Sequence, residues 1–491
     1  MDFDQRIYRD TASGLILDLS DCPALDMAGM DAALEAMAAL EGGATANPDE
    51  GRMVGHYWLR NPQRAPQPDI AADIQQTIDQ ICALDAGEHD TLLWIGVGGS
   101  GLGPQLIEHC LRGHSTPLEL CFFDNTDPEG YDFILRAIDP ARCLVVIVSK
   151  SGGTVETRNG MLAAQQRWAD AGEDFGKHAI AITVEGSRLW RAAAGWRDRV
   201  RLWDWVGGRT SITGAVGGVL MALCGMDFRA LLEGAAAMDA LTRLPPEDNP
   251  AAWLAAVWRT AGKGRGDRAL VIEPYVDRYS LLSRYLQQLV MESIGKRLDR
   301  DGNTVHQGLT VYGNKGSTDQ HAFVQQLRDG RDDTFVHFLD TADAGPNIAG
   351  VDGHLVGDHL LGFLCGTRAA LAQENRPCLT IQVPDVSARS LGMLIALFER
   401  AVGLYAELIN INAYHQPGVE AGKIAAKAAL VTLRDLEAAL GEAPQTAGAL
   451  AAAIQQPETL CWRLLHHLAE SKRAQATLGE RPRHDTFRRR N

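Results

Sequence analysis

From Thr91 onward, short apolar runs alternate with longer amphipathic segments, and this alternation limits the folds open to the chain. Nearly continuous apolar runs of this length are typical of parallel strands that are buried on both faces. The first four are TLLWIGV, LELCFFD, CLVVIVS and HAIAITV, and helix-like pieces such as LGPQLIEHCLR and TVETRNGMLAAQQRWA lie between them. A βαβ series of this kind predicts a doubly wound α/β domain.

A break at residues 244–250 (LPPEDNP) divides the series, with Asn249 as the expected N-cap and Pro250 at the first helical position. Beyond it, the predicted strands are ALVIE, LTVYG, TFVHFLD and CLTIQVP, and the predicted helices are YSLLSRYLQQLVMESIGKRL, QHAFVQQLRD and SLGMLIALFERAVGLYAELI. We therefore expect two α/β units of similar size, with an N-terminal segment before them and helices after them. The last residues, RPRHDTFRRRN, are expected to form a solvated or frayed basic end.

The composition is that of a folded chain with a large core. The 491 residues are 46% hydrophobic and 22% charged, which excludes disordered, collagen-like and disulfide-scaffold proteins. With 47 basic and 62 acidic residues the net charge is −15, so neither nucleic acid nor an anionic membrane is expected as the main partner. The nine cysteines are scattered and are expected to be free thiols.

No targeting, membrane or metal pattern stands out. The first residues, MDFDQRIYRD, lack the basic and apolar regions of a signal peptide, and no uncharged apolar run approaches the roughly 18 residues of a membrane span. No H-E-x-x-H or cysteine–histidine metal pattern occurs in the sequence. We expect a cytoplasmic protein without a metal site.

The first glycine-rich motif, IGVGGSGLGP, directly follows a predicted strand. Gly96, Gly98 and Gly101 spell G-x-G-x-x-G, and Asp124 ends the next strand at about the spacing of a ribose-binding acid, so the dinucleotide fingerprint is matched. Glycines at this junction also leave backbone amides facing a helix N-terminus, which suits any phosphate. The motif thus indicates an anion without saying which one, and a glycine turn without a ligand is also compatible.

The second motif, SKSGGTVET, again follows a predicted strand. Ser149, Ser151, Thr154 and Thr157 place hydroxyls around a glycine turn that opens a helix, and Lys150 adds a positive charge. Hydroxyls, amides and a helix dipole together make a compact monophosphate cradle. A Ser/Thr-rich helix cap is the alternative. A dinucleotide fold needs no second loop of this kind, so the motif counts against an oxidoreductase.

Two further motifs carry charged residues. VGGRTS places Arg209 behind paired glycines, where a cation could stabilise developing negative charge. In QQLVMESIGK, Gln288 and Glu292 share a helix face, as do Glu292 and Lys296. For an isolated helix, an exposed Glu–Lys pair is the simplest interpretation.

The last two motifs are weak when they are taken alone. GNKGSTDQHAF places His321 at a helix entrance, where a capping or packing histidine is the ordinary case. HQPGVEAGKIAAK contains Gln416 and Lys423 in an alanine-rich helix, where a lysine is normally just solvated.

The order of these motifs along one chain is far more specific than any one of them. GVGGSGLGP, SKSGGTVET, VGGRTS, QQLVMES, QHAF and QPGVEAGK in succession closely resemble the glucose-6-phosphate isomerase (phosphoglucose isomerase) family over residues 96–427. The longer stretches LVMESIGKRLDRDGNTVHQGLTVYGNKGSTDQHAFVQQLRDG and NAYHQPGVEAGK are most similar to its cyanobacterial-type bacterial branch.

The resemblance implies an α/β fold with two sugar-isomerase (SIS-type) domains. Each would be a mainly parallel sheet flanked by helices, and helical extensions would lie at the termini. The implied divisions are an N-terminal segment (1–75), a first domain (76–244), a second domain (251–428), and C-terminal helices with a basic tail (429–491).

The resemblance also implies reversible isomerisation of D-glucose 6-phosphate to D-fructose 6-phosphate through a cis-enediol, in glycolysis and gluconeogenesis, with no cofactor. Glu292 would shuttle a proton between C2 and C1, and Arg209 would stabilise the enediolate. His321, supplied by the neighbouring subunit of a homodimer, would assist ring opening together with Lys423. Sugar-phosphate binding would involve Gly99, Ser100, Ser149, Lys150, Ser151, Thr154, Gln288 and Gln416.

Some positions depart from the family. Gly153 stands where many relatives carry a hydroxyl residue, Ile294 replaces a residue that is often polar, and the loop before His321 is longer than in animal enzymes. These changes bear on affinity more than on activity. Two other hypotheses stay open. One is a non-catalytic sugar-phosphate-binding module, which the presence of Glu292, His321 and Lys423 argues against. The other is a dinucleotide-dependent oxidoreductase, which tight NAD binding would favour.

Overall fold

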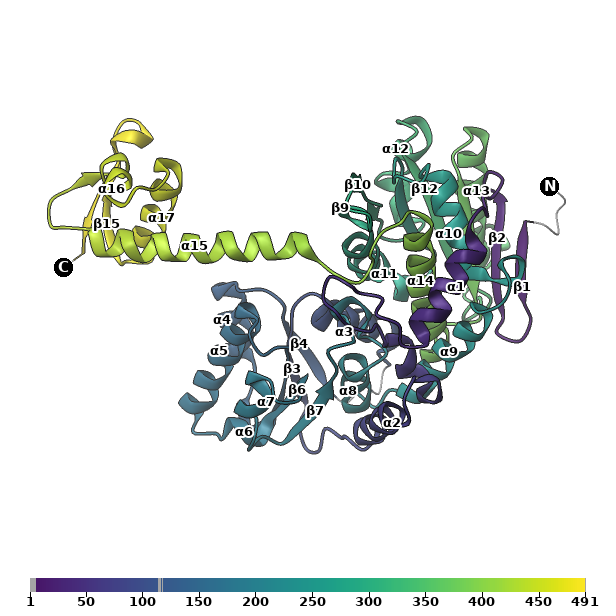
Figure 1. Cartoon of the computed structure of the whole chain (residues 1–491), viewed down its shortest axis with the longest axis horizontal. Helices are drawn as coiled ribbons and strands as arrows, with labels where there is room; N and C mark the ends of the chain where they lie inside the picture. The colour runs from purple at the N-terminus through teal and green to yellow at the C-terminus, as the bar shows by residue number, and fades with distance from the viewer. Residues whose placement is uncertain (1–5, 114–115, 117, 491) are drawn as a thin grey trace. The chain divides into compact units, whose positions relative to one another are not determined.

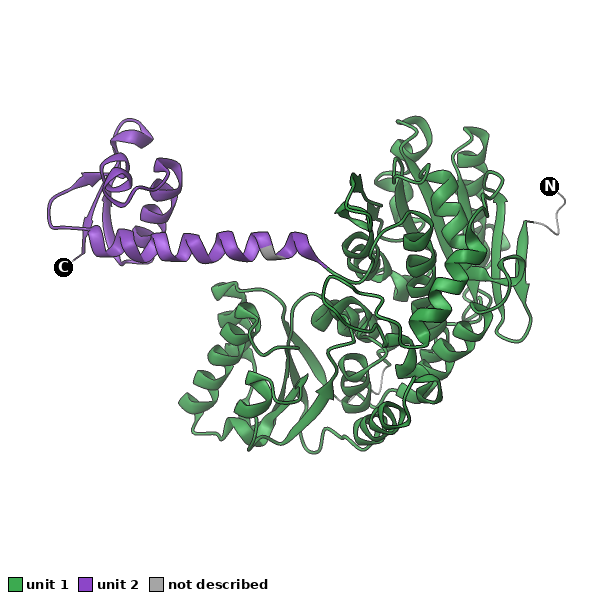
Figure 2. Ribbon diagram, in the orientation of Figure 1, with its two compact units in different colours: residues 1–415 green, residues 416–491 purple. Residues whose placement is uncertain are grey.

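The computed structural model describes every residue except 1–5, 114–115, 117 and 491. The chain forms two compact units, residues 1–415 and residues 416–491 (Figure 2). Unit 1 contains two large sheets, each with helices packed on it, and a small two-stranded sheet (Figure 1). Because both predicted α/β series lie in this unit, it is the part of the chain that positions the candidate site.

The first sheet is entirely parallel, with strand order β4-β3-β5-β6-β7. Its strands are β3 (Thr91–Ile95), β4 (Glu119–Phe123), β5 (Cys143–Val148), β6 (Ala179–Val184) and β7 (Asp198–Leu202). The four predicted strands are confirmed; β7, whose sequence DRVRL alternates charged and apolar residues, was not predicted. Alternate side chains enter different cores, since Leu92 and Trp94 pack in one apolar cluster and Leu93 and Ile95 in another.

Helices cover both faces of this sheet (Figure 1). One face carries α4 (Pro128–Ala137), α5 (Val155–Ala171), α6 (Phe175–His178) and α7 (Arg188–Ala192). The other carries α2 (Pro68–Cys82), α3 (Gly99–Leu111) and α8 (Ala215–Leu223). The doubly wound arrangement expected from the sequence is therefore confirmed.

The second sheet has a parallel centre and an antiparallel edge, in the order β1-β2-β13-β12-β8-β11. The four predicted strands form its parallel part: β8 (Ala269–Pro274), β11 (Val311–Tyr312), β12 (Thr334–Thr341) and β13 (Cys378–Val383). An N-terminal hairpin of β1 (Ile7–Asp10) and β2 (Leu15–Asp21) adds to β13 in the antiparallel direction. The sheet thus joins segments that lie more than 350 residues apart, which no local pattern reveals.

Further helices of unit 1 accompany this sheet: α1 (Met30–Glu41), α9 (Phe228–Leu241), α10 (Pro250–Ala261), α12 (Val324–Asp329), α13 (Val356–Gln373) and α14 (Ala388–Leu408). The start of α10 agrees with the sequence, because the Asn249 side chain accepts the Ala252 N–H at 3.0 Å and Pro250 is the first helical residue.

The long helix expected over residues 279–298 is interrupted. A short α11 (Leu282–Leu286) passes into a π-helix, η8 (Gln287–Glu292), and the chain then leaves the helix at Gly295. Residues Lys296–Leu298 form strand β9 in a hairpin with β10 (Thr304–Gln307). The regular-helix prediction is wrong here because a wide π-turn depends on tertiary contacts that apolar periodicity does not encode.

Six charged side chains, five of them buried and one (Arg243) half-buried, tie the N-terminal segment to α9 and α14. Asp239 on α9 is fully buried and receives two hydrogen bonds from Arg60, at 2.7 and 2.9 Å, and one from Arg400 on α14, at 2.8 Å. The remaining members are Glu41, Arg243 and Glu399. Each guanidinium of this network has a carboxylate partner, as buried charges require.

Unit 2 is a small α/β body with its own core. It contains α15 (Pro417–Ala439), α16 (Ala447–Ile454), α17 (Glu458–Glu470) and the antiparallel sheet β14-β16-β15 (Gln445–Thr446, Thr486–Arg489, Ala474–Thr477). Part of the tail expected to be solvated is therefore a strand, because Phe487 is fully buried and fixes β16 in the core.

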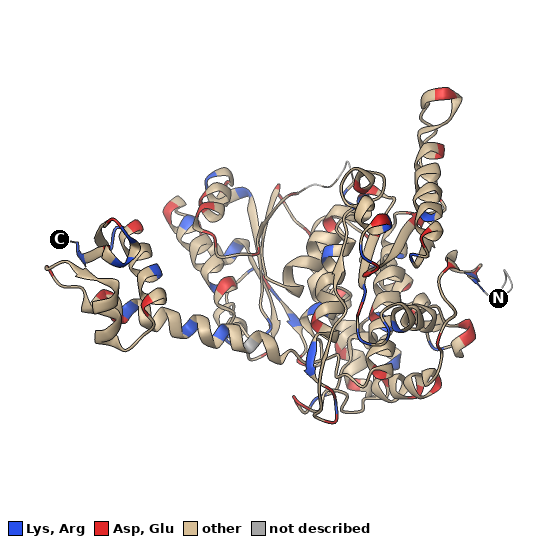
Figure 3. Ribbon diagram, turned by 90° about the horizontal axis from the view of Figure 1, so that it is seen from above, with Lys and Arg blue, Asp and Glu red and all other residues tan. Residues whose placement is uncertain are grey.

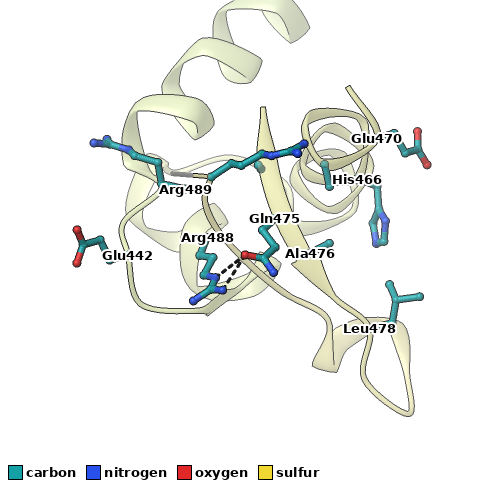
Figure 4. Close-up of a pocket in the computed structure, with 11 residues that line it drawn as sticks. Glu442, His466, Glu470, Gln475, Ala476, Leu478, Arg488 and Arg489 are labelled. Atoms are coloured by element: carbon teal, nitrogen blue, oxygen red, sulfur yellow. Dashed lines mark hydrogen bonds between the residues drawn. The ribbon is translucent and has the colours of Figure 1, made fainter. Parts of the chain in front are cut away.

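A groove of about 960 Å³ crosses unit 2 beside β16. Arg488 donates twice to the Gln475 side-chain oxygen, at 2.9 and 2.7 Å. Figure 4 shows Arg489 and Glu442 on one side and His466 and Leu478 on the other, so the labelled side chains do not converge on one point. This divergence leaves unit 1 as the place to look for a site.

Candidate active site

The first sheet has a topological switch point between β3 and β5. The chain passes from β3 to β4 on one side and later continues through β5, β6 and β7 on the other. In open α/β sheets, ligands bind where the order reverses, at the carboxyl ends of the strands. The two glycine-rich motifs follow β3 and β5, so the fold places both of them at this position.

The glycine loop after β3 is shaped by two close approaches. Gly98 has a φ of 59°, in the left-handed region that favours glycine, and an added Cβ there would lie 3.2 Å from the Gln288 amide nitrogen. A Cβ on Gly99 would lie 2.0 Å from the Gly208 carbonyl oxygen. The loop therefore packs directly against the turn that carries Arg209 and against the π-helix that carries Glu292.

The loop after β5 is held by its own hydroxyls. The Ser149 hydroxyl accepts the Gly152 N–H at 3.1 Å and donates to the Thr154 hydroxyl at 3.3 Å, and Ser151 accepts the Gly153 N–H at 3.1 Å. Among the described residues, no side chain caps the helices that begin after Gly98 and Thr154. Two uncapped helix N-termini at one switch point favour a bound anion over a Ser/Thr cap.

Lys150 connects this loop to the segment before Arg209. Its ammonium donates to the Asp204 carbonyl at 2.5 Å and to the Val206 carbonyl at 3.0 Å. Burial, with a smaller contribution from Arg52, lowers the pKa of Lys150 to about 8, and Asp204 opposes the shift. A partly desolvated lysine in this loop can meet a phosphate with little loss of hydration.

The carboxylate at the centre of the site belongs to Glu292, at the end of the π-helix. The same carboxylate oxygen lies 3.1 Å from an Arg209 guanidinium nitrogen and 3.1 Å from the Gln288 side-chain nitrogen, which donates to it. π-helical turns are rare and occur frequently at functional sites. Sequence positions more than 80 residues apart thus form one compact cluster of base, cation and amide.

Arg209 is held by backbone carbonyls in addition to its contact with Glu292. It is 7% exposed, and its second terminal nitrogen donates to the Ala413 and His415 carbonyls at 2.5 and 3.2 Å. Burial lowers the pKa of Arg209 and Glu292 opposes that shift, so the group remains a cation. A rigid, buried guanidinium beside a carboxylate is suited to stabilise an anion formed next to it.

The net charge of the chain does not conflict with such a site. Acidic and basic residues are interspersed over the helices of both units (Figure 3). The cations of the site come from separate elements, with half-buried Lys150 after β5, buried Arg209 after β7 and buried Lys296 at the start of β9. Local charge therefore allows an acidic ligand in a chain of net charge −15.

His321 is exposed and lies in a turn that packs on the end of β8. The turn η9 (Thr318–His321) precedes α12, so the helix expected to contain His321 begins three residues later. The Gly316 N–H donates to the Pro274 carbonyl at 2.7 Å, and buried Asp319 accepts the Lys315 N–H at 2.9 Å. Within the described part of the chain, no hydrogen bond or ion pair joins His321 to Glu292.

A buried glutamate lies beneath this turn. Glu273 on β8 has no exposed surface, and neither of its carboxylate oxygens has a hydrogen-bond partner among the described residues. Burial, followed by the negative charge of Asp319, raises the pKa of Glu273 to about 8. Near neutral pH the native state therefore holds a proton here that an unfolded chain has released.

We expect the Glu273→Gln variant to gain stability over the wild type as pH rises. The raised pKa favours the native state fully below about pH 4.5, and this contribution is lost as pH rises to about 8. Glutamine does not titrate, so its stability advantage should grow by on the order of 4 kcal/mol between pH 5 and 8.5. Urea unfolding at both pH values measures it, with exposed Glu35→Gln as the control; a pH-independent difference would contradict the assignment.

The other residues predicted for the site lie partly in unit 1 and partly in unit 2. Gly99, Ser100, Arg209, Gln288 and Glu292 lie at one cluster of loop and helix ends, and the Ser100 carbonyl accepts the Trp94 indole N–H at 2.7 Å. Ser149, Lys150, Ser151 and Thr154 form the neighbouring loop. Gln416 and Lys423 belong to unit 2, at and after the start of α15, so the site described here is that of unit 1.

One neighbour of Glu292 was misinterpreted from the sequence. Lys296 lies close to Glu292, as the four-residue spacing indicated, but it is buried and not part of an exposed ion pair. Its ammonium donates to the Glu292 and Ser293 carbonyls at 2.6 and 2.7 Å. Gly295 could have indicated this burial from the sequence, because a glycine often ends a helix, and here the lysine after it folds back onto the helix end.

Among the described residues, no group of three or more histidine, cysteine or acidic side chains could hold a metal ion. No helix of that part of the chain has the length and apolar character needed to cross a membrane.

Comparison with known proteins agrees with the geometry. Residues 21–355 and 367–450 match the phosphoglucose isomerase family. Curated glucose-6-phosphate isomerases of Geobacter sulfurreducens and Thermosynechococcus vestitus are each 50% identical to this chain; the matches cover 94% and 91% of this chain and 93% and 89% of those proteins. The crystal structure of a glucose-6-phosphate isomerase from Chlamydia trachomatis superposes with a TM-score of 0.81 at 26% identity, covering 88% of this chain and 91% of that one. The chain belongs to the phosphoglucose isomerase family.

Proposed function

We propose that the chain interconverts D-glucose 6-phosphate and D-fructose 6-phosphate through a cis-enediol, as a step of glycolysis and gluconeogenesis. The observation that carries this proposal is the contact of Glu292 with Arg209 and Gln288, in a chain 50% identical to a curated glucose-6-phosphate isomerase over nearly its whole length. Aldose–ketose exchange needs one base that moves a proton between adjacent carbons and one cation that stabilises the anion formed.

In this proposal, Glu292 removes the proton from C2 and returns it to C1, and Arg209 stabilises the enediolate. The phosphate lies at the switch point, where the loops after β3 and β5 offer amides, the Ser100, Ser149, Ser151 and Thr154 hydroxyls, and the Lys150 ammonium. Gln288 orients the base through its 3.1 Å hydrogen bond. Gln416 binds the sugar phosphate, and Lys423 acts with His321 on the ring oxygen.

The function is tested by turnover of the purified full-length chain. We expect conversion of fructose 6-phosphate in an assay that oxidises the glucose 6-phosphate formed, and no loss of turnover in EDTA. Binding of these sugar phosphates without turnover would contradict the proposal and favour the non-catalytic module. A panel of other hexose phosphates, including mannose 6-phosphate, would define the substrate range.

We further propose a homodimer in the cytoplasm, in which His321 completes the partner's site. Two features support this: His321 is exposed, and apolar side chains are exposed on the neighbouring α13, including Val356, Leu361 and Phe363. The turn of His321 is joined to α13 by a 2.6 Å hydrogen bond from the Gln320 amide to the Thr367 hydroxyl. An exposed histidine thus lies beside a surface suited to a protein contact.

Subunit mixing tests the exchange of His321. Chains with His321→Ala and chains with Glu292→Gln are each expected to be nearly inactive. Co-expressed, they should form heterodimers in which one site has both native side chains, so activity should return to about a quarter of wild type for random pairing. Activity no higher than that of either parent would place His321 in its own chain's site.

The domain boundaries also remain proposals. Residues 76–244 and 251–428 are proposed as the two sugar-isomerase domains, since each range contains the parallel strands of one sheet. Residues 1–75 and 429–491 would then be the terminal extensions.

A further inference from the structure

The buried lysine next to the proposed base has no assigned role. Lys296 is the first residue of β9, directly after the chain leaves the helix at Gly295, and it is 5% exposed. Its side chain folds back along the helix axis, where the ammonium donates to the Glu292 carbonyl at 2.6 Å and the Ser293 carbonyl at 2.7 Å. A lysine is seldom buried without a specific partner, and here both partners are backbone atoms at the proposed base.

These two carbonyls need a donor. The last carbonyl groups of a helix have no partner within the helix, and they carry the negative end of its dipole. The Gly295 N–H satisfies Met291 at 2.8 Å, but β9 then leads the chain away, so the next two carbonyls lack a backbone donor of the helix. Lys296 supplies both bonds from one side chain, in a site that is shielded from water.

The two hydrogen bonds from Lys296 can form whether its amine is protonated or neutral. Burial, followed by the positive charge of Arg209, lowers the pKa of Lys296 to about 7, and Glu292 opposes the shift. His415 is another titratable neighbour. Burial lowers the pKa of His415, Asp49 opposes this shift, and Lys296 adds to it. A neutral amine keeps two N–H donors, one for each carbonyl, so the contact does not depend on which form is present.

We propose that Lys296 is a positioning residue, which fixes the backbone of Glu292 at the end of the π-turn and thereby sets its carboxylate against Arg209 and Gln288. This inference rests on the proposed function, because it needs Glu292 to be the base. The two hydrogen bonds from the Lys296 ammonium hold the carbonyls of Glu292 and Ser293 in one position. Without them, the last turn of the π-helix can relax toward an ordinary α-turn, which would rotate the carboxylate.

Misplacement of a catalytic group by about 1 Å can cost about 100-fold in rate. Replacing Lys296 by methionine, which keeps the length and apolar stem but removes both donors, is therefore expected to lower kcat by about 10- to 100-fold. The KM for glucose 6-phosphate should change less than about threefold, because the loop after β5 and the amides at the switch point are untouched. A smaller folded fraction would also lower the apparent kcat at unchanged KM, so kcat is expressed per folded enzyme.

The experiment compares full-length variants by steady-state kinetics with glucose 6-phosphate. Lys177→Met, at an exposed lysine of α6, is the matched control and should keep wild-type constants. Lys296→Gln retains an amide nitrogen as donor, but on a shorter side chain, and its kcat should lie between those of the wild type and Lys296→Met. If circular dichroism shows that Lys296→Met does not fold, Lys296→Gln replaces it as the test variant.

A double-mutant cycle separates this inference from the proposed function. With Glu292 already changed to glutamine, adding Lys296→Met should lower the residual rate by less than about threefold, since no base is left to position. Wild-type kcat in folded Lys296→Met or Lys296→Gln, or an equal loss in both backgrounds, would overturn the role of Lys296. High turnover in Glu292→Gln alone would instead overturn the assignment of Glu292 as the base, and binding without turnover in the wild type would overturn the proposed function.

Discussion

The Glu292→Gln variant is expected to lose about 10²- to 10⁴-fold in kcat, the range typical of removing a general base. Glutamine matches the size of the side chain and can still contact Arg209 and Gln288, so the fold of the π-helix should be kept. It cannot accept a proton, and it removes the negative charge that lies 3.1 Å from the buried guanidinium. Steady-state kinetics in both directions of the reaction measure the loss.

The matched control is Glu129→Gln, at an exposed glutamate in the first turn of α4. It carries the same chemical change outside the residues assigned to the site and should keep the wild-type kcat. Thermal unfolding of both variants would confirm that they are folded. Turnover in Glu292→Gln close to that of the control would mean that another group carries the proton.

The largest effect on stability is expected from Asp239→Asn. This carboxylate is fully buried and receives three hydrogen bonds from Arg60 and Arg400. Removing its charge leaves two buried guanidinium groups poorly compensated, and breaking a buried ion pair in this way costs about 3–5 kcal/mol. Urea unfolding at neutral pH should show a corresponding decrease in the free energy of unfolding.

The control for this variant is Asp132→Asn. Asp132 pairs with Arg136 on α4, but both side chains are largely exposed, at 56% and 80%, so the expected cost is below about 1 kcal/mol. The arginines lower the pKa of Asp239 against the effect of burial, so its contribution is present at neutral pH and is lost only in acid. A cost for Asp239→Asn no larger than that of the control would contradict a structural role for the network.

The central strands of both sheets could be predicted because their information is local. Runs such as CLVVIVS are apolar at every position, which marks a strand buried on both faces whatever its neighbours are. β1, β2 and β7 were missed because they are short or carry charged residues between apolar ones, and such a pattern becomes a strand only through its partner. The π-turn of η8 was missed for the same reason, since its cause lies in the surrounding structure.

The site was predicted in part by spacing and in part by resemblance. The four-residue spacing of Gln288 and Glu292 correctly placed them together, and the two glycine motifs correctly predicted loops at strand ends. The contact of Gly99 with Gly208 could not be predicted from the sequence, because it joins two loops more than 100 residues apart. The burial of Lys296 was also hidden, because a lysine four residues after a glutamate has the pattern of an exposed pair.

The central claim is that Glu292 moves a proton between two carbons, and solvent exchange tests it most directly. Glucose 6-phosphate is incubated with the full-length chain in D₂O, and deuterium bound to carbon is measured by mass spectrometry as fructose 6-phosphate forms. The account predicts deuterium in the sugar with the wild type, and a decrease of exchange and turnover together with Glu292→Gln. Rapid interconversion without any deuterium uptake would contradict it, because the hydrogen would then have moved directly between the carbons.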